Sequence, residues 1–266
     1  MLNRIVKLPF LVLLIISLQV ASLRSAEKTY KALVSAYPEH LLRHSGNSLL
    51  WKDGTRMLLD DGLGKTHQQR LVSADIEDML QQTYPANICP GNQLAINFDP
   101  GRIRNSAFFK KMYGHNRAEV RNNLVKINWF GQPIYVTKVN AIDKKLTIII
   151  AELKNLPAKF RKYLYPSEGG FNWRVIAGTK RLSAHSFGAA LDLNSRFADY
   201  WWWNGDKQGR VSAYRNKIPR EIVEIFERHG FIWGGKWYHY DTMHFEYRPE
   251  LIALAKPVAC DKSVRP

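Results

Sequence analysis

Two histidines and two aspartates in the C-terminal half have the residue types that a hydrolytic metal site requires. His185, Asp192 and His244 supply two neutral imidazoles and one carboxylate. Such a three-ligand set leaves the fourth tetrahedral position of a zinc ion open for water. Asp241 precedes His244 by three residues and is a carboxylate placed to take a proton from that water. The pattern therefore predicts a zinc-dependent hydrolase.

Strand geometry separates the tasks of these carboxylates. Alternation in a strand puts His244 and Glu246 on one face, whereas Met243 and Phe245 enter the core. Asp241 cannot share the His244 face in a regular strand, so we expect it in the preceding loop, where it contacts water and not zinc. Glu246 is a candidate to orient the His244 imidazole, with an ordinary surface glutamate as the alternative.

The first ligand pair requires a strand and a close backbone approach. Asp192 lies in an alternating run in which Leu191 and Leu193 face inward. Gly188, between His185 and Asp192, permits close approach of the backbone between the two ligands.

Two further features lie near these residues. The three tryptophans of the run Trp201-Trp202-Trp203 cannot all be core in one regular element, because side chains alternate in direction. We expect these tryptophans either to wall a groove for sugar and peptide, with Trp203 in contact with substrate, or to pack beneath the following helix. His239, two residues before Asp241, is a candidate to support the site or touch substrate, and a plain loop histidine is the alternative.

The elements that position these residues predict an α+β fold, with a small, mostly antiparallel sheet and helices packed on one face. Periodicity and turn residues indicate four helices: over 73–82 with Ser73 as cap, from the 99–104 turn through Met112, from Asn140 and Asp143 to Leu153, and from Pro219 to Gly230. They also indicate a hairpin over 125–137 that turns at Gly131-Gln132, and strands over 171–177, 191–194 and 243–247.

The N-terminus predicts export. Residues 1–22 combine a basic start, an apolar run and small residues before the expected cleavage site, as a secretory signal does, and an uncleaved membrane anchor is the alternative. We expect no later membrane span and a periplasmic or secreted protein. In an oxidising compartment Cys89 and Cys260 are able to pair, and two free thiols are the alternative.

No sharp domain boundary is visible in this 266-residue chain. We expect residues 23–140 to form an N-terminal region of the same domain or an appended one. Residues 141–256 are expected to be the catalytic core, and 257–266 a tail.

The formal net charge of +16 favours an anionic partner, and a plainly solvated basic surface is the alternative. Export argues against nucleic acid and favours an acidic wall polymer.

The motifs carry a family resemblance. Ser183-x-His185-x-x-Gly188 through Asp192, followed by Asp241-x-Met-His244-Phe-Glu246, resembles the zinc D-alanyl-D-alanine carboxypeptidases and the related L-alanyl-D-glutamate endopeptidases. The run Trp233-Gly-Gly-Lys-Trp strengthens the likeness, which covers about residues 171–250. It implies a fold like that of Hedgehog and the DD-peptidases, one zinc ion per chain on the three ligands above, and Asp241 as general base.

The resemblance also implies roles outside the ligand set. An arginine upstream of the first histidine polarises the scissile carbonyl; Arg174 is the match, and Arg181 is the rival. Ser183 is either a substrate contact or a turn-stabilising hydroxyl. Many relatives have glutamate at the base position, and the aspartate of this chain is found in the endopeptidase branch.

The resemblance leads to one expected function and two alternatives. We expect a carboxypeptidase-like enzyme that hydrolyses peptidoglycan stem peptides or muropeptides. A wall endopeptidase is the first alternative, and a zinc-retaining wall-binding module without catalysis is the second. The oligomeric state is left open.

Overall fold

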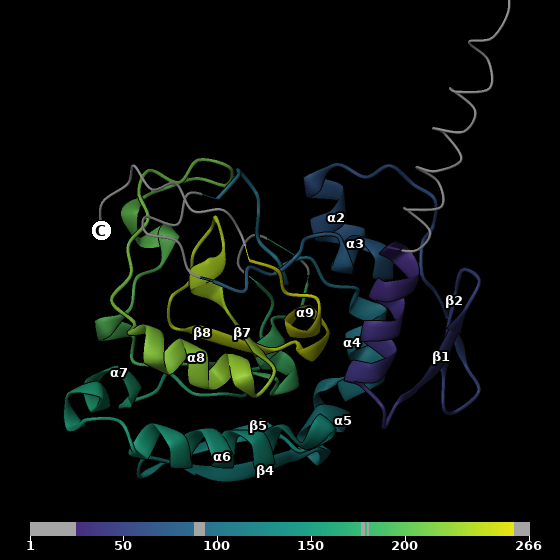
Figure 1. Ribbon diagram of the computed structural model, residues 1–266. Helices are drawn as coiled ribbons and strands as arrows, with labels where there is room; N and C mark the ends of the chain where they lie inside the picture. Colours follow the sequence, from purple (N-terminus) through teal and green to yellow (C-terminus); the bar gives the residue numbers. More distant parts are fainter. Residues whose placement is uncertain (1–24, 88–93, 177–178, 180, 258–266) are drawn as a thin grey trace, which may run out of the picture.

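A small antiparallel sheet forms the centre of the C-terminal half. The computed structural model describes residues 25–87, 94–176, 179 and 181–257 (Figure 1). The sheet has the order β6 (Ala190–Asp192), β8 (His244–Tyr247), β7 (Phe231–Trp233). The expected signal segment, Cys89 and Cys260 lie outside the described residues, so the disulfide and the signal stay predictions.

The register of this sheet sorts its side chains between two faces. Asp192 is opposite His244, and Leu191 is opposite Phe245. Because side chains alternate along a strand, the two polar residues share one face and the two apolar residues share the other. Phe245 stacks on Phe226 at 4.0 Å between ring centroids, which fixes the apolar face against helix α8 (Arg220–Arg228).

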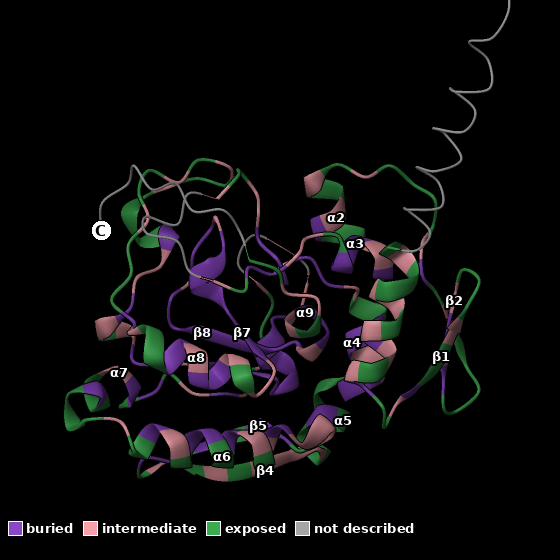
Figure 2. Cartoon of the chain, in the orientation of Figure 1, coloured by how far each residue is buried: buried purple, intermediate pink, exposed green. Residues whose placement is uncertain are grey.

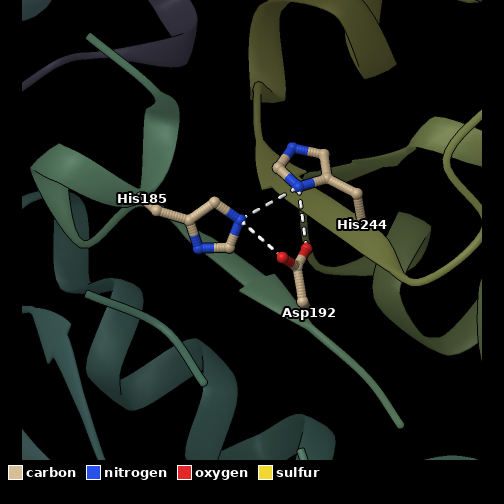
Figure 3. A group of neighbouring side chains, drawn as sticks. All are labelled: His185, Asp192 and His244. Atoms are coloured by element: carbon tan, nitrogen blue, oxygen red, sulfur yellow. Dashed lines mark hydrogen bonds and ion pairs between the residues drawn. The ribbon is translucent and has the colours of Figure 1, made fainter. Parts of the chain in front are cut away.

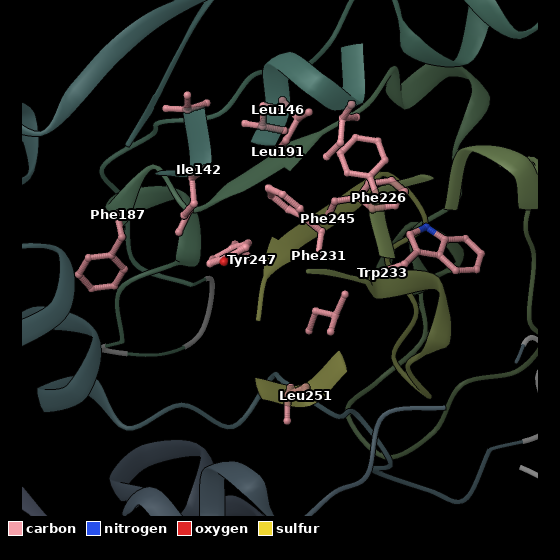
Figure 4. Close-up of a cluster of buried hydrophobic side chains, with 14 of the residues drawn as sticks. Ile142, Leu146, Phe187, Leu191, Phe226, Phe231, Trp233, Phe245, Tyr247 and Leu251 are labelled. Atoms are coloured by element: carbon pink, nitrogen blue, oxygen red, sulfur yellow. The ribbon is translucent and has the colours of Figure 1, made fainter. Parts of the chain in front are cut away.

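Helices cover the apolar face of the sheet, as the sequence predicted. Helix α6 (Ile142–Lys154) packs beside α8, and both bury one apolar side (Figure 2). Figure 4 shows Leu146 of α6 and Phe226 of α8 gathered around Leu191 and Phe245. The polar face is left for the residues that could do chemistry. The α+β class is therefore confirmed.

The predicted hairpin is present, with its turn shifted by one residue. Strands β4 (Leu124–Trp129) and β5 (Gln132–Thr137) pair antiparallel, and Trp129 is opposite Gln132. Phe130 and Gly131 make the turn with φ of 51° and 98°, so the expected Gly131-Gln132 turn is wrong. A two-residue turn with both φ values positive matches the twist of the flanking strands, and Gln132 is thereby free to begin β5.

The described part of the expected strand over 171–177, residues 171–176, is not a strand. Its backbone bonds go to separate neighbours: Phe171 N–H donates to the Tyr135 carbonyl, and Asn172 N–H donates to the His185 carbonyl. Val175 makes only an isolated bridge, to Leu182. The segment therefore packs as an irregular strap across β5 and the turn that carries His185, because its backbone hydrogen bonds go to more than one neighbour.

The N-terminal region has its own small sheet and a group of short helices. The expected helix over 73–82 is divided: Ser73 ends α2, and Asp75 caps α3 by accepting from Asp78 N–H at 2.8 Å, with the side chain of Asp78 returning to the cap. Ser73 is therefore not the cap, since an aspartate two residues later makes a full capping box. The elements are β1 (Leu41–Ser45), β2 (Ser48–Trp51), β3 (Arg56–Leu58), α2 (His67–Ser73), α3 (Ile76–Leu80), α4 (Ser106–Tyr113) and α5 (Arg117–Asn122), after a helix over 25–36.

Short helical turns connect the larger elements of the catalytic half. The single-turn helix η4 (Ala184–Phe187) carries His185 and ends at Gly188. The others are η2 (Val139–Ala141), η3 (Ala158–Phe160), α7 (Arg161–Leu164), η5 (Ser195–Phe197), η6 (Trp201–Asn204), η7 (Gly234–Lys236) and α9 (Pro249–Ala253). None of the helices within the described ranges has the length and apolar character needed to cross a membrane.

The N-terminal region and the catalytic half share one hydrophobic core. Buried apolar side chains form a continuous cluster from Leu33 to Leu251. Polar contacts also cross between the two regions: the Trp237 indole donates to the Pro100 carbonyl at 2.7 Å, and Tyr37 donates to Glu250 at 2.7 Å. The two regions are therefore in contact through buried surface.

Candidate active site

Three side chains from separate elements converge on the polar face of the sheet. His185 comes from η4, Asp192 from the end of β6 and His244 from the start of β8 (Figure 3). His185 Nε2 lies 3.1 Å from Asp192 Oδ2, and His244 Nδ1 lies 2.9 Å from Asp192 Oδ1. The two ring nitrogens are 3.1 Å apart. The group could hold a metal ion, because its ligand atoms all lie within 4.8 Å of one another.

Hydrogen bonds on the outer side of each ring set which nitrogen faces the centre. His185 Nδ1–H donates to the Gly170 carbonyl at 2.7 Å, and His244 Nε2–H donates to Glu246 at 3.4 Å. With these protons placed outward, both inward nitrogens present lone pairs beside the Asp192 carboxylate. Two lone pairs and a carboxylate repel one another unless a cation lies between them. The donor set therefore fits zinc.

The turn that carries His185 is built by its neighbours in sequence. The Ser183 hydroxyl accepts from His185 N–H at 3.4 Å and caps η4. Gly188 ends the turn at φ of 66°, where a Cβ would lie 2.9 Å from Thr137 N. The close approach that Gly188 allows is thus toward the β4–β5 hairpin, and this fixes η4 against β5. The sequence reasoning expected an approach between the two ligands instead.

Gly170 lies on the outer side of the His185 ring, next to Nδ1. Its carbonyl receives the Nδ1 proton, and a Cβ at this position would lie 2.5 Å from the Tyr135 carbonyl. Only glycine fits between the ring and strand β5 without moving that strand. The backbone at Gly170, just before the strap, therefore orients the imidazole.

The electrostatics of the group favour a bound cation. Burial opposes the charged form of His244, but the carboxylates of Asp192 and Glu246 outweigh it and raise the pKa of His244 to about 10. Burial likewise opposes ionisation of Asp192, and the two imidazoles, His185 first, hold its pKa well below the usual value. The same surroundings that retain a proton on an imidazole would retain a divalent metal ion in its place.

Asp241 lies in the loop before β8, as the strand geometry predicted. Its N–H donates to the Gly234 carbonyl at 3.0 Å, and its own carbonyl accepts from His244 N–H at 3.2 Å. Burial, followed by repulsion from Asp192, raises the pKa of Asp241 to about 6. The buried Oδ1 atom of Asp241 has no hydrogen-bond partner among the described residues. A carboxylate oxygen is thus available beside the converging ligands.

Glu246 is held by an arginine from the N-terminal region. Arg104 Nε donates to Glu246 Oε1 at 2.8 Å, and Arg104 Nη2 contacts Oε2. Arg248 lies 3.5 Å from the same carboxylate. Burial raises the pKa of Glu246, but Arg104 above all outweighs it and leaves the pKa well below the usual value. Glu246 is therefore a fully buried anion that joins Arg104 to the His244 ring, and the surface alternative is wrong.

A cavity of about 320 Å³ opens over the three converging side chains. Both candidate arginines of the sequence reasoning, Arg174 and Arg181, line it, so geometry does not separate them by position alone. Arg174 is exposed and makes no ion pair with a described carboxylate, whereas Arg181 donates from Nη1 to the Arg102 carbonyl at 3.0 Å. Among the described residues, the head group of Arg174 has no such tether, and Arg174 is exposed to solvent at the cavity.

The three tryptophans of the run differ in solvent exposure, because their side chains point in different directions. Trp201 is buried at 2% exposure, whereas Trp202 and Trp203 are 58% and 57% exposed. Trp201 packs on the ring of His239, and Trp203 lines the cavity. The groove-wall alternative is therefore available to Trp203.

His239 has both ring nitrogens engaged by protein groups. Nδ1–H donates to Asp99 at 2.7 Å, and Nε2 accepts from Gly209 N–H at 2.9 Å. Asp99 also accepts the His239 N–H at 2.8 Å and pairs with Arg102. No ring nitrogen is left for substrate, so His239 instead ties the 99–104 turn to the loop that carries Gly209.

The sequence reasoning missed the contribution of the 99–104 turn. Asp99, Arg102 and Arg104 all reach the site region, and the last two line its cavity. The signal was visible as two guanidiniums in one turn, but no partner for them could be recognised from local spacing. Their partners, Asp99 for Arg102 and Glu246 for Arg104, are brought to them only by the fold.

The geometry is that of a site able to hold a divalent metal ion beside a buried carboxylate, as metal-dependent hydrolases have. Residues 177–247 match the model of the family described as D-alanyl-D-alanine carboxypeptidase. The match supports the family resemblance that the motifs carry. The matched range contains His185, Asp192, Asp241 and His244, and it begins after Arg174. No curated protein and no solved structure matched the chain.

Proposed function

We propose that this protein is an exported zinc peptidase that hydrolyses peptide bonds in peptidoglycan stem peptides. One observation carries the proposal: two imidazole lone pairs and a carboxylate converge, and a second carboxylate with a free oxygen lies beside them. The family match over residues 177–247 supports a peptidase. The net charge of +16 fits an acidic wall polymer.

We assign the metal ligands to His185, Asp192 and His244. When bound, zinc would polarise the scissile carbonyl and make a water molecule acidic enough to attack it at neutral pH. The outward hydrogen bonds to Gly170 and Glu246 keep both imidazoles in the tautomer that binds a metal. A single ion per chain satisfies this set.

Asp241 is the proposed general base. Its raised pKa, about 6, leaves it ionised at neutral pH yet basic enough to accept a proton from water. The protonated carboxyl then gives that proton to the leaving amine, so Asp241 returns to its starting state. Burial supplies the shift, because a charged carboxylate is costly away from solvent.

Arg174 is the proposed stabiliser of the oxyanion, and Arg181 is the alternative. The exposed, unpaired head group of Arg174 is able to reach a substrate in the cavity. Trp203 is proposed to wall the groove, and Ser183, which also lines the cavity, is proposed to contact substrate.

Product analysis on defined muropeptides tests the proposal. We expect the purified protein with zinc to release a terminal D-alanine, which mass spectrometry detects as a carboxypeptidase product. Release of whole stem peptides or opened cross-links would instead establish the endopeptidase that an aspartate at position 241 favours. Absence of turnover with zinc bound would contradict both and leave a wall-binding module.

A further inference from the structure

A second, larger cavity lies next to the site. It has a volume of about 680 Å³, within the range of small-ligand pockets. Helix α2 contributes Leu71 and Val72, α4 contributes Phe109, and η4 contributes Phe187. Its walls are therefore mainly apolar, and they come from both the N-terminal region and the turn that carries His185.

Among the described residues, three cations and no carboxylate line this second cavity. Arg104 is neutralised by its pairing with Glu246. Lys110 of α4 and Arg181 have no ion pair with a described acidic residue. The cavity thus combines apolar walls with uncompensated positive charge, which selects a ligand that has methylene groups and an anionic end.

Arg181 is the cation most in need of an anion. Its Nη1 donates to the Arg102 carbonyl, but its buried Nε has no hydrogen-bond partner. Burial and the adjacent guanidiniums of Arg104 and Arg102 lower the pKa of Arg181. A carboxylate placed against this guanidinium would satisfy Nε and offset the repulsion.

The second cavity and the site cavity share two wall residues. Arg104 and Arg181 line both of them, so a peptide held over the converging ligands has both guanidiniums within its reach. A side chain that branches from such a peptide would enter the apolar cavity past these two residues. The cavity therefore suits a branch of the substrate instead of an independent ligand.

We propose that the second cavity is a substrate subsite that receives an aliphatic side chain ending in a carboxylate on the stem peptide. The inference rests on the proposed function for the position of the scissile bond. A side chain ending in an ammonium alone would face Lys110 and Arg181 without compensation, so the subsite discriminates between the two kinds of side chain.

Two stem pentapeptides that differ only at the third residue test the subsite. One carries diaminopimelate and the other lysine, so the side chains differ by a terminal carboxylate. We expect kcat/KM of the zinc-loaded protein to be at least about tenfold higher for the diaminopimelate peptide, because one charge-assisted hydrogen bond is gained. Equal kcat/KM values would overturn the proposal.

Variants that alter only the second cavity localise the effect. Lys110→Glu reverses a charge, and Val72→Trp narrows the opening; neither residue lines the site cavity. Lys110→Glu should bring the ratio of kcat/KM values to one or below, because the new carboxylate repels the diaminopimelate carboxylate and attracts the lysine ammonium. Val72→Trp should bring the ratio toward one, because it restricts entry of both side chains. Lys144→Glu and Ile148→Trp, at exposed positions of α6, are the matched controls and should keep the wild-type ratio. A wild-type ratio in both cavity variants would also overturn the proposal.

Equilibrium binding separates failure of the subsite from failure of the proposed function. If neither pentapeptide is hydrolysed, the peptidase proposal fails while the subsite is still measurable. Calorimetry with the two tripeptides that end at the third residue then decides. Tighter binding of the diaminopimelate tripeptide, lost in Lys110→Glu, supports the subsite, and equal binding of the two tripeptides overturns it.

Discussion

Among the single residues of the site, two aspartates stand out because the fold shifts their pKa values in opposite directions. Asp192 lies between two imidazoles, and its pKa is held below the usual value, whereas burial and the charge of Asp192 raise the pKa of Asp241 to about 6. Identical side chains thereby become suited to different tasks, one to holding a cation and one to exchanging a proton.

Replacement of Asp241 tests this division. We expect Asp241→Ala to lower kcat by roughly 10²- to 10⁴-fold, because proton transfer is lost, while one zinc per chain is retained. Elemental analysis and muropeptide turnover are the measurements. Asp241→Asn should behave in the same way, since the amide keeps the shape but accepts no proton. Undiminished activity in either variant would remove Asp241 from the mechanism.

Arg104 is expected to influence zinc binding from outside the ligand set. Arg104→Met leaves the buried Glu246 carboxylate with only the longer contact to Arg248, which disturbs the partner of the His244 ring. Zinc affinity, measured by competition with a chromophoric chelator, should fall by about 10- to 100-fold. Arg117→Met, at an exposed position of α5, is the control. Equal affinities in the two variants would show that Arg104 does not act through Glu246.

At the scale of elements, the site depends on how the 99–104 turn is joined to the loop before β8. Asp99 accepts two hydrogen bonds from His239 and pairs with Arg102. Burial raises the pKa of Asp99, but Arg102 and His239 outweigh it and the net shift is downward. This junction therefore contributes to stability only while Asp99 is ionised.

The pH dependence of unfolding tests that junction. A depressed pKa means that the unfolded chain binds more protons than the folded protein, so stability falls as pH drops below the unfolded value of about 3.9. Asp99→Asn should have a lower Tm at neutral pH but a smaller fall in Tm between roughly pH 5 and pH 3. Calorimetric scans measure both. An unchanged fall would contradict the role of Asp99.

The elements also show where sequence patterns succeed. Residues with a regular period, such as Leu146, Ile149 and Leu153 of α6, identified their helix because one buried stripe determines it. The strap over 171–176 was read as a strand because apolar residues alone do not reveal which partners their backbone will find. Its hydrogen bonds go to β5 and to η4, which only the tertiary fold brings alongside.

At the scale of the whole molecule, the N-terminal region supplies buried partners to the catalytic half. Glu246 is paired by Arg104, Glu250 accepts from Tyr37, and Glu227 accepts from Tyr84. Without these residues, three carboxylates in the catalytic half would lose partners in the interior. We therefore infer that the two regions form one folding unit.

Expression of residues 141–256 alone tests this inference. We expect the fragment to lack a cooperative thermal transition, because buried charges without partners and the exposed face of the shared core are both destabilising. Circular dichroism and calorimetry would show the difference from the full chain. A sharp, two-state transition in the fragment would establish an independent catalytic domain.

Metal binding should stabilise the whole protein. Zinc at about 100 times its Kd adds roughly 2.7 kcal/mol to the free energy of unfolding, which raises Tm by several degrees. Asp241→Ala should keep this response, and His244→Ala should lose it, because only the latter removes a ligand. A Tm that does not respond to zinc in the wild type would contradict the metal site.

Local spacing predicted the candidate ligand types and the loop position of Asp241, since alternation along a strand is a property of the backbone, and the motifs carried the family resemblance. The surroundings of these residues depend on the tertiary fold. Arg104 meets Glu246 across 142 residues of chain, and Asp99 meets His239 across 140. Spacing carries no information about such pairs, because contacts between distant segments arise only when the core forms.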